Sequence, residues 1–168
     1  MPAAEPLAQQ SSRVYADYWR FTINLGSNMQ DPPLDPDLAP GADIIATHNH
    51  SAVVRTSFRS GSVDIDLQSW QHDPGPIDTQ YDAVATAVIA SDRSSIWVEG
   101  FMSSSGAVRM DLPPSEYYTV RVYSFHRFLD SDLDSTESAP YEMDAPGDEV
   151  ERYLIQAWPS GNVTSPSS

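Results

Sequence analysis

The sequence contains no cysteine and no lysine, and nowhere do about 18 apolar residues follow one another. Without cysteine the chain has no disulfide, no thiol nucleophile and no cysteine-ligated zinc. The first residues, MPAAEPLAQQSS, lack the basic and apolar regions of a secretory signal. These absences predict a cytoplasmic protein that does not enter a membrane.

Positive charge is scarce, whereas negative charge is abundant. The chain has 24 acidic residues against nine arginines, which gives a net charge of −15. Binding to DNA or RNA requires a basic surface that neutralises phosphates, so this composition argues against direct nucleic-acid binding. The same composition favours a basic protein as the partner.

The acidic residues are concentrated in two stretches. Residues 26–43 contain four aspartates and four prolines, and residues 130–151 contain five aspartates and four glutamates, with no basic residue in either. Long stretches without regular structure are uncommon in a compact domain and are usually functional or disordered. We therefore predict that the second stretch binds the partner. The predicted contact residues are Asp130, Asp132, Asp134, Glu137, Glu142, Asp144, Asp148 and Glu149.

Helical periodicity is hard to find, whereas apolar and polar residues alternate in many runs. The run RVYADYWRFTINLG, which begins at residue 13, is expected as one strand. From Trp19 to Leu25 its odd-numbered residues are apolar and its even-numbered residues are polar, which is typical of a strand buried on one face. Similar runs, separated by glycine, serine and proline, predict eight or nine strands in sequential hairpins. The predicted fold is all-β: an antiparallel two-sheet β-sandwich with two long acidic loops.

The same pattern predicts the domain boundaries. We expect a disordered N-terminal segment at residues 1–12, a single β-sandwich domain at residues 13–159 and a disordered tail at residues 160–168. The residues expected in the core lie on the apolar side of the alternating runs. They are Trp19, Phe21, Ile23, Val63, Ile65, Leu67, Val120 and Val122.

The run SSIWVEGFM is apolar on both faces. Trp97, Glu99 and Phe101 face one way, while Ile96 and Val98 face the other. This pattern predicts a central strand with its aromatic residues in the core. The alternative is that Trp97 and Phe101 lie on an exposed face and anchor a partner.

His48-Asn49-His50 spells the letters of an HNH nuclease, but such a site takes its three residues from separate parts of its fold. A metal site is the alternative, because His48 and His50 would project to one side of an extended segment. They could share an ion with His72, Asp73 or His126. The glutamate that follows such a pair in cupins is missing, so we expect a polar turn and no tightly bound transition metal.

Asp130, Asp132 and Asp134 have the spacing of the first half of an EF-hand calcium loop. The second half does not fit, because the sixth position is Ser135 rather than glycine and the twelfth is Tyr141 rather than glutamate. We expect no cofactor, with a structural calcium ion in this stretch as the alternative.

No catalytic motif is recognisable. The sequence lacks a G-x-S-x-G elbow and a glycine-rich phosphate loop. Carboxylate pairs have little diagnostic value in so acidic a chain. We predict a noncatalytic protein, and the alternative is a small metal-dependent hydrolase that uses His48, His50 and His126.

Several segments, taken in order, are similar to one known family. They are YADYWRFTINLG, DPPLDPDLAPGADI, VDIDLQSW, YDAVATAVIASDRSSIWVEG and VRMDLPPSEYYTVRVYSF. The last carries most of the likeness, since Asp111-Leu112-Pro113 there precedes a tyrosine-rich strand. Over roughly residues 15–128, the chain resembles the DNA-entry nuclease inhibitor, or competence protein J, family of small bacterial β proteins.

The resemblance implies a noncatalytic inhibitor or immunity-type protein whose basic partner is a nuclease. The charge permits this, because carboxylates can occupy places that a nuclease provides for phosphates. Two other classes stay open. One is a β-sandwich module that binds carbohydrate or calcium, and the other is a structural component of an assembly.

Overall fold

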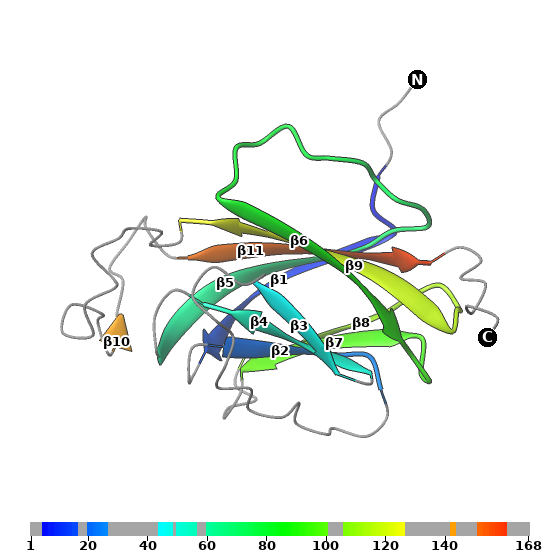
Figure 1. Cartoon of the computed structure of the whole chain (residues 1–168), viewed down its shortest axis with the longest axis horizontal. Coiled ribbons are helices and arrows are strands. Elements are labelled where there is room, and N and C mark those ends of the chain that lie inside the picture. The colour runs from blue at the N-terminus through cyan, green and yellow to red at the C-terminus, as the bar shows by residue number, and fades with distance from the viewer. Residues whose placement is uncertain are drawn as a thin grey trace.

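A computed structural model of the chain describes residues 5–16, 20–26, 44–48, 50–56, 60–100, 106–126, 142–143 and 151–160. Within this part of the chain every regular element is a strand, and the eleven strands form two facing sheets (Figure 1). The prediction of an all-β, two-sheet fold is confirmed. No helix of the described residues is long and apolar enough to cross a membrane.

The larger sheet has the strand order β1-β5-β11-β9-β6, with β10 also paired to β5. Its strands are β1 (Ala8–Ala16), β5 (Ser60–Ser69), β6 (Ala83–Ala90), β9 (Tyr117–Phe125), β10 (Glu142–Met143) and β11 (Arg152–Pro159). β10 and β11 run parallel to β5, and the other pairs in this sheet are antiparallel.

The smaller sheet has the order β3-β4-β2-β7-β8, and all its pairs are antiparallel. Its strands are β2 (Arg20–Asn24), β3 (Ile45–His48), β4 (Ser51–Arg55), β7 (Ser95–Gly100) and β8 (Val108–Asp111). Sequential hairpins, which we expected throughout, account only for β3 with β4 and β7 with β8. Most other neighbours in the two sheets are distant in sequence.

The core lies between the two sheets and follows the alternation of the sequence. In β5, Val63, Ile65 and Leu67 are fully buried, whereas Asp64 and Asp66 between them remain partly exposed on the outer face. The core prediction is confirmed for seven residues, each 0% exposed: Phe21, Ile23, Val63, Ile65, Leu67, Val120 and Val122. The eighth, Trp19, lies outside the described residues.

Two expectations for the N-terminal part were wrong. The run from residue 13 to residue 25, expected as one strand, supplies β1 to the larger sheet and β2 to the smaller one. In addition, β1 begins at Ala8, within the segment 1–12 that was expected to be disordered. An edge strand with an exposed polar start lacks the alternation of a buried strand, and pairing with β5 stabilises it instead.

The connection from β5 to β6, residues 70–82, crosses the outer face of the larger sheet (Figure 1). Asp73 in this connection pairs with Arg121 of β9 at 2.9 Å, and the Tyr81 ring meets the Tyr123 ring edge-on at 4.9 Å. The Arg121 guanidinium also lies 4.7 Å from the centre of the Trp158 ring. Tyr123 and Trp158 are therefore buried although they point away from the core.

Replacing Asp73 with asparagine is expected to lower the free energy of unfolding at pH 7 by about 0.5 kcal/mol, because the carboxylate is half exposed. The hydrogen bond from Arg121 holds the pKa of Asp73 below its ordinary value. A carboxylate with a lowered folded-state pKa stabilises the protein above its unfolded pKa, and this contribution is lost as the pH falls through the folded pKa. Urea unfolding at pH 7 and below pH 4 measures the difference. An equal loss at both pH values would contradict this account of the pair.

Candidate functional site

One end of the sandwich holds both ends of the long acidic segment, which we define as residues 127–150. β9 leads into this segment and β11 follows it, and the two strands are antiparallel neighbours with Phe125 opposite Arg152. Within the segment, the backbone of Glu142–Met143 forms β10 and pairs with Ser60 and Gly61 at the start of β5. The start of β5 belongs to the same end of the larger sheet, since Arg152 and Asp64 are in register.

The other acidic stretch, residues 26–43, ends at the same place. Ile44 follows this stretch directly, and its carbonyl oxygen accepts a 2.8 Å hydrogen bond from the backbone N–H of Arg55. The carbonyl oxygen of Arg55 lies 3.2 Å from the hydroxyl of Tyr153, which donates a hydrogen bond to the carboxylate of Glu151. Glu151 directly follows the long acidic segment. We call Ile44, Arg55, Glu151 and Tyr153 the anchor cluster.

The anchor cluster connects the two sheets, and three of its members, Ile44, Glu151 and Tyr153, are buried while Arg55 is half-buried. Tyr153 is fully buried and comes from β11 of the larger sheet, whereas Arg55 ends β4 of the smaller one. The Tyr153 ring meets the ring of Phe21 edge-on at 4.9 Å, with Phe21 in β2. Glu151 is only 3% exposed, and its carbonyl oxygen also accepts a hydrogen bond from the N–H of Asp64. These hydrogen bonds and ring contacts make the point at which the long acidic segment joins the sandwich rigid.

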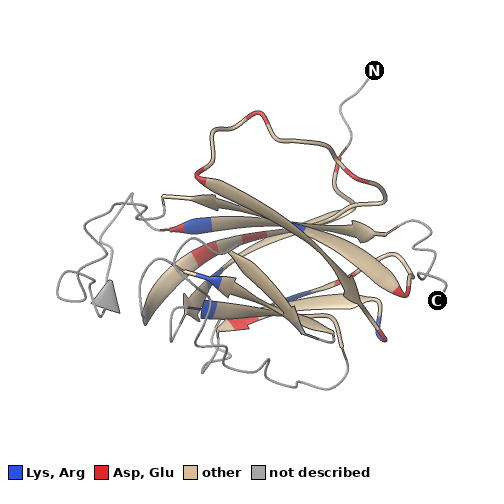
Figure 2. Cartoon of the chain, viewed as in Figure 1, with Lys and Arg blue, Asp and Glu red and all other residues tan. Residues whose placement is uncertain are grey.

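Arginines on the outer face near this end are engaged with neighbouring side chains. Arg13 of β1 pairs with Asp64 at 2.9 Å, and this contact raises the pKa of the guanidinium. Arg152 lies 4.2 Å from the centre of the Phe125 ring and 3.8 Å from Asp66. Figure 2 shows acidic and basic residues close together on β5 and β11. Both of these guanidinium groups are therefore already engaged with side chains of the sheet rather than with the eight carboxylates of residues 127–150.

Most of the predicted contact residues cannot be placed. Asp130, Asp132, Asp134, Glu137, Asp144, Asp148 and Glu149 lie outside the described residues. Of Glu142 only the backbone is described, in register with Ser60. The fold shows where the long acidic segment is attached to the sandwich.

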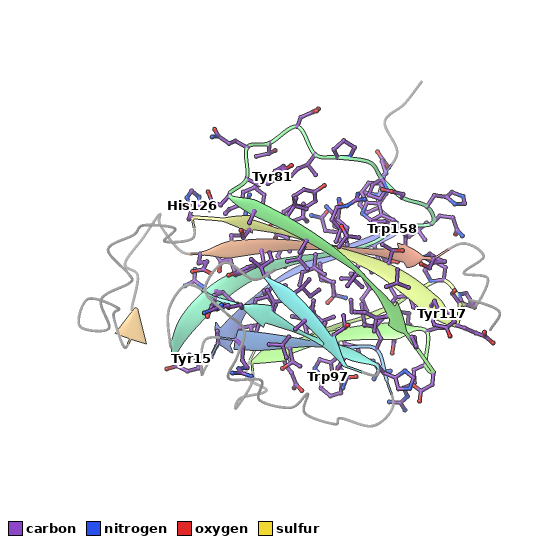
Figure 3. The ribbon with its side chains drawn as sticks, viewed as in Figure 1. Tyr15, Tyr81, Trp97, Tyr117, His126 and Trp158 are labelled. Atoms are coloured by element: carbon purple, nitrogen blue, oxygen red, sulfur yellow. The ribbon has the colours of Figure 1, made fainter. Side chains whose placement is uncertain are left out.

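The histidines lie in different parts of the sandwich. The Nδ1 atom of His50 lies 3.0 Å from the carbonyl oxygen of Ala90, next to the start of β9, whereas His126 follows the end of that strand. A strand of this length spans about 26 Å. Figure 3 shows His126 and Tyr117 at opposite ends of β9. The predicted alternative of one hydrolytic cleft that joins these histidines is therefore wrong for His50 and His126.

The structure describes the other metal candidates only in part. The backbone of His48 ends β3, Asp73 is paired with Arg121, and the side chain of His48 is not described. His50 packs against Gly26, where an added Cβ would lie 2.6 Å from the Cβ of His50. Across the described ranges, no three His, Asp or Glu residues are placed to hold a metal ion.

The strand SSIWVEGFM is central, as predicted, since β7 lies between β2 and β8. Ile96 and Val98 are fully buried between the sheets. Trp97 lies on the other face and is only partly buried (Figure 3), and Phe101 is outside the described residues. The expectation that Trp97 packs in the core is therefore wrong. The alternative of an exposed aromatic anchor formed with Phe101 stays a prediction.

Sequence reasoning did not identify the anchor cluster. Its hydrogen bond between Tyr153 and Arg55 joins residues 98 positions apart in the chain. In the sequence, the cluster is marked only by Glu151 at the end of the acidic stretch and by the alternating run that follows it.

Comparisons with known proteins show similarity in fold only. No protein-family model matches the sequence, and no curated protein is significantly similar to it. The structure resembles the crystal structure of ComJ from Bacillus subtilis, described as an inhibitor of the DNA degrading activity of NucA. The TM-score is 0.58 at 13% identity, over 95% of this chain and 100% of that one. It also resembles the protein described as crocagin biosynthetic gene J, with a TM-score of 0.53 at 12% identity, over 92% of this chain and 99% of that one. The distant resemblance to the competence protein J family is thus confirmed at the level of structure.

Proposed function

We propose that this chain is a noncatalytic inhibitor that binds a basic protein through the acidic residues attached at the anchor cluster, and that the partner is a nuclease. The observation that carries the proposal is the topology. It attaches the long acidic segment and the end of residues 26–43 to one hydrogen-bonded cluster of Ile44, Arg55, Glu151 and Tyr153. Thirteen of the 24 carboxylates of the chain belong to these two stretches, with Glu151 included.

The electrostatics support a cationic partner. Residues 127–150 contain eight carboxylates and one arginine. Two such carboxylates in close contact repel each other by up to about 1 kcal/mol even in water. A basic groove relieves this repulsion and attracts the segment over roughly the Debye length, about 10 Å at 0.1 M salt. A nuclease has such a groove because it binds phosphates.

The structural comparison favours a nuclease among the basic proteins. ComJ is described as an inhibitor of a DNA-degrading activity, and its fold covers nearly all of this chain. A shared fold alone does not establish a shared function, so the proposal also rests on the electrostatics of the acidic stretches. The separation of His50 and His126 and the pairing of Asp73 with Arg121 support a noncatalytic role.

Affinity capture followed by a DNA degradation assay tests the proposal. The purified chain is immobilised, incubated with extract of its native host at about 50 mM salt, and eluted with a salt gradient, because charge-driven complexes dissociate as salt rises. We expect a basic protein that degrades DNA when free and is inhibited by stoichiometric addition of this chain. An unrelated protein of equal net charge serves as the control matrix. Recovery of a partner without DNA-degrading activity, or of a nuclease that stays active in the complex, would contradict the proposal.

A further inference from the structure

One of the two outermost strands of the larger sheet, β6, has an edge that pairs with no described strand. It pairs with β9 on one side, and none of the described strands pairs with its other side. Its sequence, AVATAVIA, has no charge, proline or glycine, which are the residues that proteins commonly use to block an edge strand. Val84 and Val88 are 43% and 50% exposed on its outer face. Within the described part of the chain, no backbone hydrogen bonds to another strand occupy this edge.

The hydrogen bonds identify the backbone groups that are free to pair. The N–H of Ser91 donates to the carbonyl oxygen of Glu116 at 2.8 Å, so Ser91 and every second residue before it bond to β9. The N–H and C=O groups of Val84, Thr86, Val88 and Ala90 therefore point away from β9. The carbonyl oxygen of Ala90 already meets His50 at 3.0 Å. The available part of the edge is residues 84–88.

This part of the edge is complementary to itself. When a second copy of the strand is placed antiparallel about Thr86, Val84 lies opposite Val88 of the second copy and Thr86 lies opposite Thr86 of the second copy. Each of these pairs uses backbone groups that point away from β9, and each pair exchanges two hydrogen bonds. Pairs of β-branched residues stabilise antiparallel strands. A shift by one residue would instead place groups already bonded to β9 at the interface.

We infer that the chain forms a two-fold symmetric dimer in which two β6 strands pair antiparallel about Thr86 and join the larger sheets of two copies into one. The net charge of −15 is compatible with this arrangement. β6 begins at the end of the sandwich that carries the long acidic segment, since Ala83 is in register with Ser124 near the end of β9. Antiparallel pairing therefore places the acidic segments of the two copies at opposite ends of the dimer. The remaining repulsion is screened by salt.

Charge substitutions at Thr86 test the dimer by sedimentation velocity over a concentration series. The wild-type chain is expected to shift from monomer to dimer between about 10 µM and 1 mM in 0.3 M salt, because a small interface gives weak association. Thr86→Lys and Thr86→Glu each place like charges opposite one another across the two-fold axis, so each alone should stay monomeric. An equimolar mixture of the two should form a heterodimer. Gln9→Lys adds the same charge at an exposed position of β1 and should leave the dimer unchanged.

A single cysteine tests the register directly, because the chain has none of its own. Opposed residues of a hydrogen-bonded pair have Cα atoms about 5.5 Å apart, which suits a disulfide. Under mild oxidation Thr86→Cys should give a covalent dimer, whereas Gln9→Cys should give at least ten-fold less. Circular dichroism establishes that each variant folds. A wild-type chain that stays monomeric up to about 1 mM would overturn the inference and leave the edge to a strand of another protein. Equal cross-linking by the two cysteine variants would overturn it as well.

Discussion

Neutralising the long acidic segment is expected to weaken binding of the basic partner by about 100- to 1000-fold, mainly by slowing association. The variant changes eight residues to their amides: Asp130, Asp132, Asp134, Glu137, Glu142, Asp144, Asp148 and Glu149. The rate of association should approach roughly 10⁸ M⁻¹s⁻¹ for the wild type at low salt and fall steeply as salt rises. Stopped-flow measurements at several salt concentrations would show a much weaker salt dependence for the variant.

Two smaller variants with the same net charge separate a local effect from a general one. The first neutralises Asp130, Asp132, Asp134 and Glu137. The second neutralises four exposed carboxylates elsewhere in the described structure: Glu5, Asp78, Asp111 and Glu116. We expect the first variant to associate at least ten-fold more slowly than the second. Equal rates would show that only the net charge matters.

Calcium provides the discriminating control for the same segment. If Asp130→Asn, Asp132→Asn and Asp134→Asn together remove a calcium-dependent increase in thermal stability and leave partner binding unchanged, the stretch is an ion site. The inhibitor proposal would then lose its electrostatic basis. We expect the opposite pattern, with slower partner binding and thermal stability that is independent of calcium.

Replacing Tyr153 with alanine is expected to lower the free energy of unfolding by about 3–5 kcal/mol. The side chain is fully buried, packs edge-on against Phe21 and bonds to Glu151. Replacing it with phenylalanine keeps the packing and removes the hydroxyl, for an expected loss of about 1–3 kcal/mol. Urea unfolding followed by far-UV circular dichroism measures both losses.

Tyr117→Ala is the matched control for Tyr153, because Tyr117 lies in the neighbouring strand β9 with its ring exposed. Its loss should stay below about 1 kcal/mol. If Tyr117→Ala were as destabilising as Tyr153→Ala, the anchor cluster would have no special role in holding the two sheets together.

Alternation of apolar and polar residues was sufficient to predict the fold class and the core. It works in β5 because Val63, Ile65 and Leu67 face the other sheet while Asp64 and Asp66 face outward. The same signal failed where a strand lies at an edge with both faces partly exposed, as in the first half of β1. It also did not separate β1 from β2, although the apolar core positions change from even-numbered residues (Val14, Ala16) to odd-numbered ones (Phe21, Ile23).

The position of the candidate site could not be predicted because it depends on strand pairing between distant segments. Charge density identified residues 130–151 as unusual. It did not reveal that β11 inserts between β5 and β9, parallel to β5, and so brings Tyr153 to the end of β4. Local patterns contain little information on such pairings. The histidines illustrate the opposite case, since His48-Asn49-His50 is conspicuous as a sequence while His50 packs against Gly26 and Ala90.

Amide hydrogen exchange of the free chain and of its complex with the captured nuclease tests the central claim most directly. We predict slower exchange in the complex across residues 127–150 and at the adjoining strand ends, His126 and Arg152. Exchange should be unchanged in the connections at the other end of the sandwich, residues 91–94 and 115–116. Protection confined to residues 91–94 and 115–116, with none across 127–150, would contradict binding through the acidic end.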